Sequence, residues 1–176
     1  MARAFVSVGS NIAPADNVLL ALRRLAGEVR IVAVSTFYRT APLGRPEQPD
    51  FYNGVVAVET ELSPADLKHA VLRHIEEQLG RERTEDKYAP RTIDLDVLLY
   101  DELVMDTGGL AIPDPDIARR PFLAIPLHEV APGLVLPGSG RPMADIAAEL
   151  AHHDMQPLPE YTELLRESVG HGSREG

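Results

Sequence analysis

Apolar and polar residues alternate over residues 93–100, and this alternation predicts a β-strand. Side chains two apart in a strand share a face, so one face of this strand is apolar and suited to packing beneath helices. That face comprises Ile93, Leu95, Val97 and Leu99. Asp94 and Asp96 are then expected side by side on the opposite face.

Three more strands and two helices are predicted upstream of this strand. The strands are expected at residues 3–8, 31–40 and 52–61, where β-branched and aromatic residues are frequent. One helix opens at Pro14 and ends at Gly27, and its apolar residues recur with helical spacing. The other is capped by Ser63 and stops at Gly80.

The order strand, helix, strand, strand, helix, strand predicts an α+β fold, a ferredoxin-like βαββαβ sandwich with a mostly antiparallel sheet. Both helices are expected on one face, with the other face free. C-terminal helical additions are expected at 120–130 and 142–151, and short strands at 103–105 and 110–112.

Residues 1–155 are expected to form a single domain, followed by a tail at 156–176. The tail is expected to contain one or two helical turns at 161–166 and to be partly disordered at its end.

Composition narrows the function classes. A net charge of -10 argues against a general nucleic-acid binder and against an anionic membrane surface as partner. The chain has no cysteine, which excludes disulfides, thiolate zinc sites and cysteine nucleophiles and fits a reducing compartment. The first residues lack the apolar core of a secretory signal, and no run approaches the ~20 apolar residues of a membrane helix. A cytoplasmic protein is therefore expected.

The candidate chemistry centres on Asp94 and Asp96. Two adjacent carboxylates repel each other unless positive charge lies between them, and a divalent metal such as Mg²⁺ suits all-oxygen ligands. Basic residues over 81–91 add positive charge that would suit phosphate. The alternative from these residues alone is a solvated ion-pair network on the strand surface.

Five segments resemble the 6-hydroxymethyl-7,8-dihydropterin pyrophosphokinase family. The strongest is APRTIDLDVLLYD at 89–101, which is similar to the family signature. Four others follow the family order: VSVGSN at 6–11, STFYRTAPLG at 35–44, QPDFYN at 48–53 and RRPFLAIPLHEVAP at 119–132. Such an ordered set is far more specific than any single motif.

The resemblance implies transfer of pyrophosphate from ATP to 6-hydroxymethyl-7,8-dihydropterin, which gives the pterin diphosphate and AMP in folate biosynthesis. Positioning and charge neutralisation carry most of such a transfer. Two Mg²⁺ ions that bridge the triphosphate are implied, with Asp94 and Asp96 between them and ATP as co-substrate. Arg81 and Arg91 are the other catalytic candidates, and Asp94 is expected to orient or deprotonate the hydroxyl group.

The resemblance also implies two sets of binding residues. For the pterin these are Thr40, Pro42, Leu43, Phe51, Asn53 and Phe122. For ATP these are Glu76, Arg83, Tyr88, Arg91, Val97, Asp114 and Arg120. The loop 80–90 is expected to act as a lid over both substrates.

Two positions depart from the family pattern. Asp114 stands where the family commonly has histidine, and Gly109 stands where a basic residue can occur. Both changes remove positive charge from the nucleotide side, so weaker ATP binding is expected. Arg119 is a candidate for partial compensation.

Three other functions fit parts of the sequence. The strand order also serves RNA-binding modules, although acidic residues on the sheet face would repel phosphate. A pterin- or nucleotide-binding regulatory domain would use the same residues without catalysis, and a family member inactivated at Asp114 is a third alternative. Small molecules are the expected partners, with a neighbouring folate-pathway enzyme as a further candidate.

Overall fold

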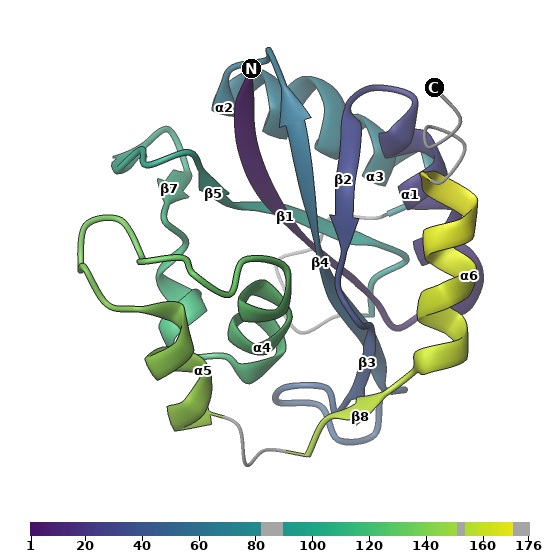
Figure 1. Cartoon of the computed structure of the whole chain (residues 1–176). Coiled ribbons are helices and arrows are strands. Elements are labelled where there is room, and N and C mark those ends of the chain that lie inside the picture. The colour runs from purple at the N-terminus through teal and green to yellow at the C-terminus, as the bar shows by residue number, and fades with distance from the viewer. Residues whose placement is uncertain (82–89, 151–153, 171–176) are drawn as a thin grey trace.

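The computed structural model describes residues 1–81, 90–150 and 154–170 and places an antiparallel sheet between layers of helices (Figure 1). Strand β1 (Ala2–Ser10) lies at the centre, between β4 (Phe51–Thr60) and β5 (Asp94–Tyr100). The strand pairings in the described part of this sheet are all antiparallel. Together with the element order, they confirm the predicted ferredoxin-like class.

The far edge of β4 pairs with two strands in succession rather than one. The expected strand at 31–40 divides into β2 (Arg30–Val34) and β3 (Tyr38–Thr40). Ser35 lies in the interruption, where its backbone N–H donates to the Val55 carbonyl at 2.9 Å and its hydroxyl accepts from the Val55 N–H at 2.9 Å. The Ser35 hydroxyl thus replaces a backbone carbonyl as the hydrogen-bond acceptor for β4 at this point. The short β8 (Gln156–Pro157) extends the sheet from β3.

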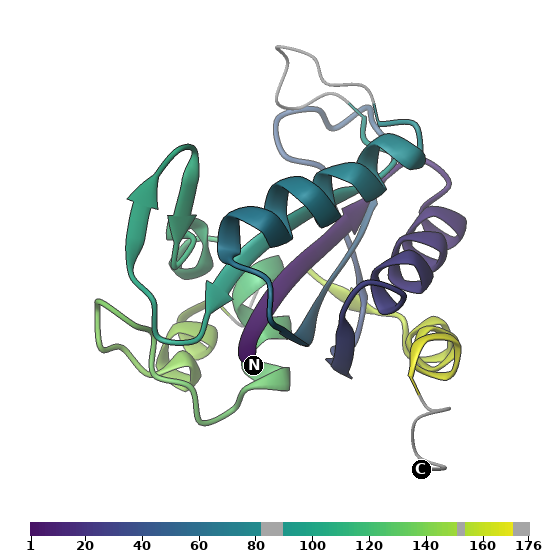
Figure 2. The ribbon, with the colours of Figure 1, turned by 90° about the horizontal axis from the view of Figure 1, so that it is seen from above.

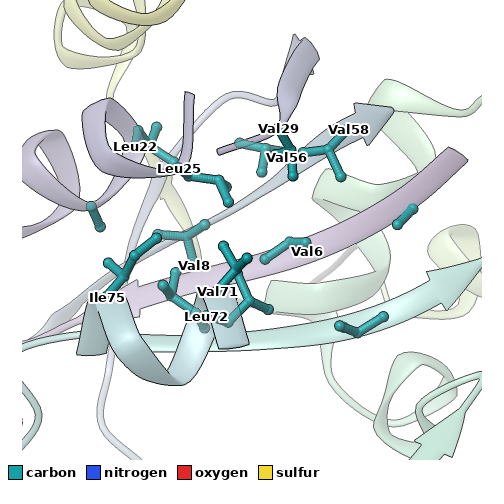
Figure 3. Packing of buried hydrophobic residues seen from close by; sticks show 14 of the residues in the cluster. Val6, Val8, Leu22, Leu25, Val29, Val56, Val58, Val71, Leu72 and Ile75 are labelled. Atoms are coloured by element: carbon teal, nitrogen blue, oxygen red, sulfur yellow. The ribbon is translucent and has the colours of Figure 1, made fainter. Parts of the chain in front are cut away.

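One face of the sheet is covered by the two predicted helices. These are α1 (Pro14–Ala26) and a second helix made of α2 (Pro64–Asp66), a π-helical stretch η1 (Leu67–Leu72) and α3 (Arg73–Gln78). Figure 3 shows their buried side chains packed over valines of β1 and β4. The first helix ends at Gly27 as predicted, and the second just before Gly80.

The other face of the sheet was expected to be free, and this prediction is wrong. Helices α4 (Pro121–Val130) and α5 (Met143–Leu150), preceded by a 3₁₀ turn η2 (Pro115–Ala118), pack over part of it. Apolar residues of β1 and β4 on this side, such as Phe5 and Val55, need such cover. The predicted C-terminal helical additions supply it, so only one end of this face stays open.

A β-bulge in β5 changes the predicted apolar face. Phe5 of β1 pairs with Leu99, but the next residue, Val6, pairs with Val97, so Leu98 is the extra residue. Beyond the bulge the alternation reverses, and Leu99 joins Leu98 in the cluster beneath α4. The predicted face is correct from Ile93 to Val97 and wrong at Leu99.

Two C-terminal elements differ from the expectation. The hairpin of β6 (Met105–Thr107) and β7 (Leu110–Ile112) starts later than predicted. Helix α6 (Pro159–Val169) is longer than the expected one or two turns and lies beside α1 (Figure 2). Its buried Thr162 accepts the Phe37 N–H at 2.9 Å, so the helix is tied to the sheet. The end of the tail, 171–176, lies outside the described residues.

In the described part of the chain, no helix has the length and apolar character needed to cross a membrane.

Gly54 of β4 lies directly against the fully buried ring of Phe37, and a Cβ atom at this position would meet ring carbons at 2.5 Å. We expect Gly54→Ala to lower the free energy of unfolding by about 2 kcal/mol, because the packed ring cannot move away freely. Urea unfolding measures this, with Gly133→Ala as control, since a Cβ there meets nothing within 4 Å. Equal effects of the two substitutions would contradict the packing argument.

Candidate active site

Three neighbouring strands bring the candidate polar residues to the open end of the α4 face. In the sheet register, Gly9 of β1 pairs with Asn53 of β4 on one side and with Asp94 of β5 on the other. Two residues earlier, Ser7 pairs with Asp96. The predicted placement of the two carboxylates on one face is therefore correct.

A cavity of about 280 Å³ opens at this end of the sheet. It gathers residues that the sequence assigned separately to the pterin, to ATP and to catalysis. Those residues are Thr40, Pro42, Leu43, Phe51, Asn53, Arg91, Asp94, Asp96, Asp114, Arg120 and Phe122. Residues that the sequence did not single out, including Ser7, Asp116 and Leu123, complete the wall.

Asn53 is fixed within this cavity by close packing. Its amide nitrogen donates to the Thr40 hydroxyl at 2.7 Å, and a Cβ atom at Gly9 would lie 2.5 Å from its Oδ1. Only glycine leaves room for the carboxamide in this position. The fixed carboxamide is part of the cavity lining.

The turn after β1 fixes Arg91, which lies shortly before β5, the strand that carries Asp94 and Asp96. The buried Asn11 donates its backbone N–H to the Arg91 carbonyl at 3.1 Å, and its Oδ1 accepts the Arg91 N–H at 2.8 Å. Its amide nitrogen also donates to Gln48 Oε1 at 3.2 Å. One side chain thus connects Arg91 with the loop before β4.

Two arginines neutralise Asp94. Arg81 Nη1 donates to Asp94 Oδ1 at 2.9 Å, and Arg91 Nη1 donates to Asp94 Oδ2 at 2.6 Å. Arg81 Nη1 also forms a short ion pair with the buried Glu76. The ion-pair network considered from the sequence is therefore real, and it lies inside the cavity wall rather than on a solvated surface.

Asp96 has a different environment. Among the described residues, none donates a hydrogen bond to its carboxylate. Burial, and next the charge of Asp94, raise the pKa of Asp96 from 3.8 to about 7; Glu76 and Asp114 add to this rise, while Lys68 opposes it. A carboxylate with so little compensation is suited to a cation.

The two aspartates fit Mg²⁺. In the described ranges, no cluster of three or more His, Cys, Asp or Glu side chains is arranged to hold a metal. Mg²⁺ does not need such a cage, because it is commonly held by one or two carboxylates together with water and substrate phosphates. Asp94 and Asp96 form that kind of donor set.

A second, polar hollow of about 240 Å³ adjoins the first cavity and shares Arg91, Asp94 and Asp96 with it. Lys68 and Arg73 line it, and sequence reasoning missed both. They precede Glu76 on the same helix, and their positive charge near that acidic residue was the available clue. Basic residues on a helix are usually solvated, so that clue was weak.

Two described residues that the sequence singled out, Val97 and Arg119, are absent from both linings. The Val97 side chain is buried in the core beneath the helices, so only its backbone is left for a nucleotide contact. Arg119 is exposed and lies 3.8 Å from Asp116, outside both linings, so the suggested compensation receives no support. Arg83, Tyr88 and most of the expected lid fall outside the described residues.

Asp114 has a structural role in addition to its place in the cavity. Its side chain accepts the Asp116 N–H at 2.8 Å and so caps η2, while its own N–H donates to the Leu98 carbonyl at 2.9 Å. Burial raises the pKa of Asp114. The capping bond gives a physical reason for aspartate at this position.

Comparison with known proteins points to one family. The model of the 7,8-dihydro-6-hydroxymethylpterin-pyrophosphokinase family matches residues 5–132. The 2-amino-4-hydroxy-6-hydroxymethyldihydropteridine pyrophosphokinase of Haemophilus influenzae is 37% identical over 158 residues, which cover 88% of this chain and 97% of the relative. The protein of that name from Pseudomonas aeruginosa is 41% identical over 161 residues, which cover 89% of this chain and 97% of the relative.

Solved structures agree on the fold. A Plasmodium falciparum HPPK-DHPS chain superimposes with a TM-score of 0.68 at 13% identity, over 85% of this chain and 45% of that chain. This chain thus spans less than half of that solved chain. At such identity the likeness supports the fold alone.

The raised pKa of Asp96 leads to a prediction about stability. The folded state holds the proton more tightly than the unfolded state, so this stabilisation is present below pH ~4 and is lost as pH rises toward 7. Without divalent metal, we expect Asp96→Asn to raise the free energy of unfolding at pH 8 by about 2 kcal/mol, and to change it little at pH 4.

Urea unfolding in EDTA at both pH values tests this prediction. Asp50→Asn is the control, because Asp50 is exposed on the loop before β4. A gain for Asp96→Asn that does not depend on pH would show that burial does not raise this pKa.

Proposed function

The chain belongs to the 7,8-dihydro-6-hydroxymethylpterin-pyrophosphokinase family, and we propose that its two adjoining hollows hold the two substrates of the reaction. The enzyme transfers pyrophosphate from ATP to 6-hydroxymethyl-7,8-dihydropterin in folate biosynthesis, giving the pterin diphosphate and AMP. No comparison supports the regulatory alternative. The convergence of Asp94, Asp96, Arg91 and Asn53 on one cavity is the observation that carries the assignment of the site.

The pterin is assigned to the first cavity. Phe51 and Phe122 line it and offer apolar surface to a flat ring, and Asn53 offers a donor and an acceptor to the ring's amide-like edge. Thr40, Pro42 and Leu43 form the neighbouring wall. This division keeps the roles that the sequence predicted for these residues.

ATP is assigned to the second hollow and the edge of β5. Lys68, Arg73, Arg81 and Arg91 concentrate positive charge there in an otherwise acidic protein. Arg120, in the wall of the first cavity, is a further phosphate candidate. Asp114 and Gly109 contribute no such charge, so ATP affinity is expected to depend on Lys68, whose ammonium donates to the Gly109 carbonyl at 3.2 Å.

Asp94 and Asp96 would hold Mg²⁺, which neutralises polyphosphate charge when bound. The residues themselves then have distinct tasks. Arg81 and Arg91 orient phosphate oxygens through charge-assisted hydrogen bonds. The sequence favoured Asp94 for orienting the hydroxyl, but both its oxygens already accept from guanidinium groups. Among the described residues no guanidinium group pairs with Asp96, so its carboxylate is better placed than that of Asp94 to orient the hydroxyl group.

Partner and location stay predictions. The solved relatives carry HPPK and DHPS in one chain, which makes a neighbouring folate-pathway enzyme a candidate partner for this protein. A cytoplasmic location fits the lack of cysteine.

Incubation with ATP, Mg²⁺ and the hydroxymethyl pterin should release AMP together with the pterin diphosphate. Asp94→Ala and Asp96→Ala are each expected to lower kcat by at least ~100-fold, since electrostatic stabilisation supplies most of the catalysis. Circular dichroism should show a folded protein in both cases. AMP release that persists in either variant would remove that aspartate from the site.

Gly9→Ala tests the pterin cavity. The added methyl group would displace the Asn53 carboxamide, so we expect KM for the pterin to rise about 10-fold or more while KM for ATP changes little. Steady-state kinetics with each substrate varied in turn measure both constants. An equal rise in both KM values would mean that the substitution disturbs the whole sheet rather than the pterin cavity.

A further inference from the structure

We propose that Glu76 is a positioning residue, which acts through Arg81 and through the backbone of β5 rather than by binding ATP. This inference rests on the proposed function, because it takes Arg81 to contact the polyphosphate. It differs from the sequence-based expectation, in which Glu76 binds the nucleotide directly.

Burial is the first argument. Glu76 is 3% exposed, and a carboxylate at this depth needs compensating donors to remain charged. The structure provides them within the protein: Arg81 forms an ion pair with Glu76 Oε2, and the Leu95 N–H donates to that same atom at 3.0 Å. The Glu76 carboxylate is thus bound by groups of the protein itself.

The identity of those donors is the second argument. Leu95 lies between Asp94 and Asp96, so the bond to its N–H fixes the backbone that carries both candidate metal ligands. Arg81 is the cation that pairs with Asp94. A single oxygen therefore sets the position of a guanidinium group relative to the strand on which it acts.

The sharing of Arg81 is the third argument. One nitrogen of Arg81 lies between two acids, Glu76 and Asp94. In the proposed function Asp94 also serves a cation, and its hold on Arg81 then weakens. Glu76 keeps Arg81 at the site under those conditions, because the second ion pair does not involve the substrates.

Charge argues against direct ATP binding by Glu76. The carboxylate lines the polar hollow assigned to the nucleotide, where an anion would repel phosphate if it were not neutralised. The ion pair with Arg81, whose side chain is 14% exposed, neutralises the charge of Glu76 and so removes that repulsion. The pair together presents a cation of fixed direction.

A double-mutant comparison tests the proposal on the full chain. Glu76→Gln keeps an acceptor for the Leu95 N–H but removes the charge that holds Arg81. We expect it to lower kcat by about 30-fold in the otherwise natural protein, and by less than about 3-fold in the Arg81→Gln background, because residues that act as a unit are not additive. KM for the pterin should stay within about twofold.

The control is Glu77→Gln, an exposed neighbour on α3, which should leave kcat within about twofold. Equal losses in both backgrounds would overturn the proposal, since Glu76 would then act independently of Arg81. A loss below about 3-fold in the natural background would overturn it as well.

Two further measurements keep the test decisive. Thermal unfolding shows whether Glu76→Gln folds; if it does not, a loss of kcat above about 3-fold from Arg81→Gln to the double variant still overturns the proposal. If Arg81→Gln alone retains full kcat, the proposed role of Arg81 fails and the positioning role of Glu76 fails with it. AMP release by the natural protein would still support the proposed reaction.

Discussion

The candidate site depends on how the negative charge at the start of β5 is balanced. Asp94 and Asp96 lie on one face of the same strand, in a chain whose net charge is -10. Asp94 is balanced by two guanidinium groups, while Asp96 is left with a strongly raised pKa. This asymmetry gives two chemically identical side chains different surroundings: Asp94 is paired with arginines, and Asp96 is not.

The sheet makes this asymmetry compatible with a binding cavity. β1 lies between the strand that carries the carboxylates and the strand that carries Asn53, and Gly9 has no side chain to separate them. Farther along the same face, α4 and α5 bury the apolar residues. One face therefore contains both a packed core and an open polar end. The first turn of α4 places Phe122 where these two regions meet.

The sequence predicted most of what depends on local pattern. Alternation placed Asp94 and Asp96 on one face, and helical periodicity placed α1 and α3. Longer-range effects were not visible. The bulge at Leu98 depends on how β1 pairs with β5, and the ion pair of Arg81 with Glu76 depends on the turn at the end of α3, where the Arg81 N–H donates to the Glu76 carbonyl. Helix α6 had a readable pattern, since Tyr161 and Leu165 are four apart, but the polar residues around them concealed it.

The pair of hydrogen bonds between Asn11 and Arg91 has a consequence for folding. Its two partners are separated by most of the sheet along the sequence, so the contact forms only after β1 and β5 have been brought together. Closing such a distant contact is entropically costly and usually occurs late, with the cooperative formation of the whole domain. The Arg91 backbone is thus expected to reach its final position beside the cavity only in molecules in which β1 and β5 have already paired.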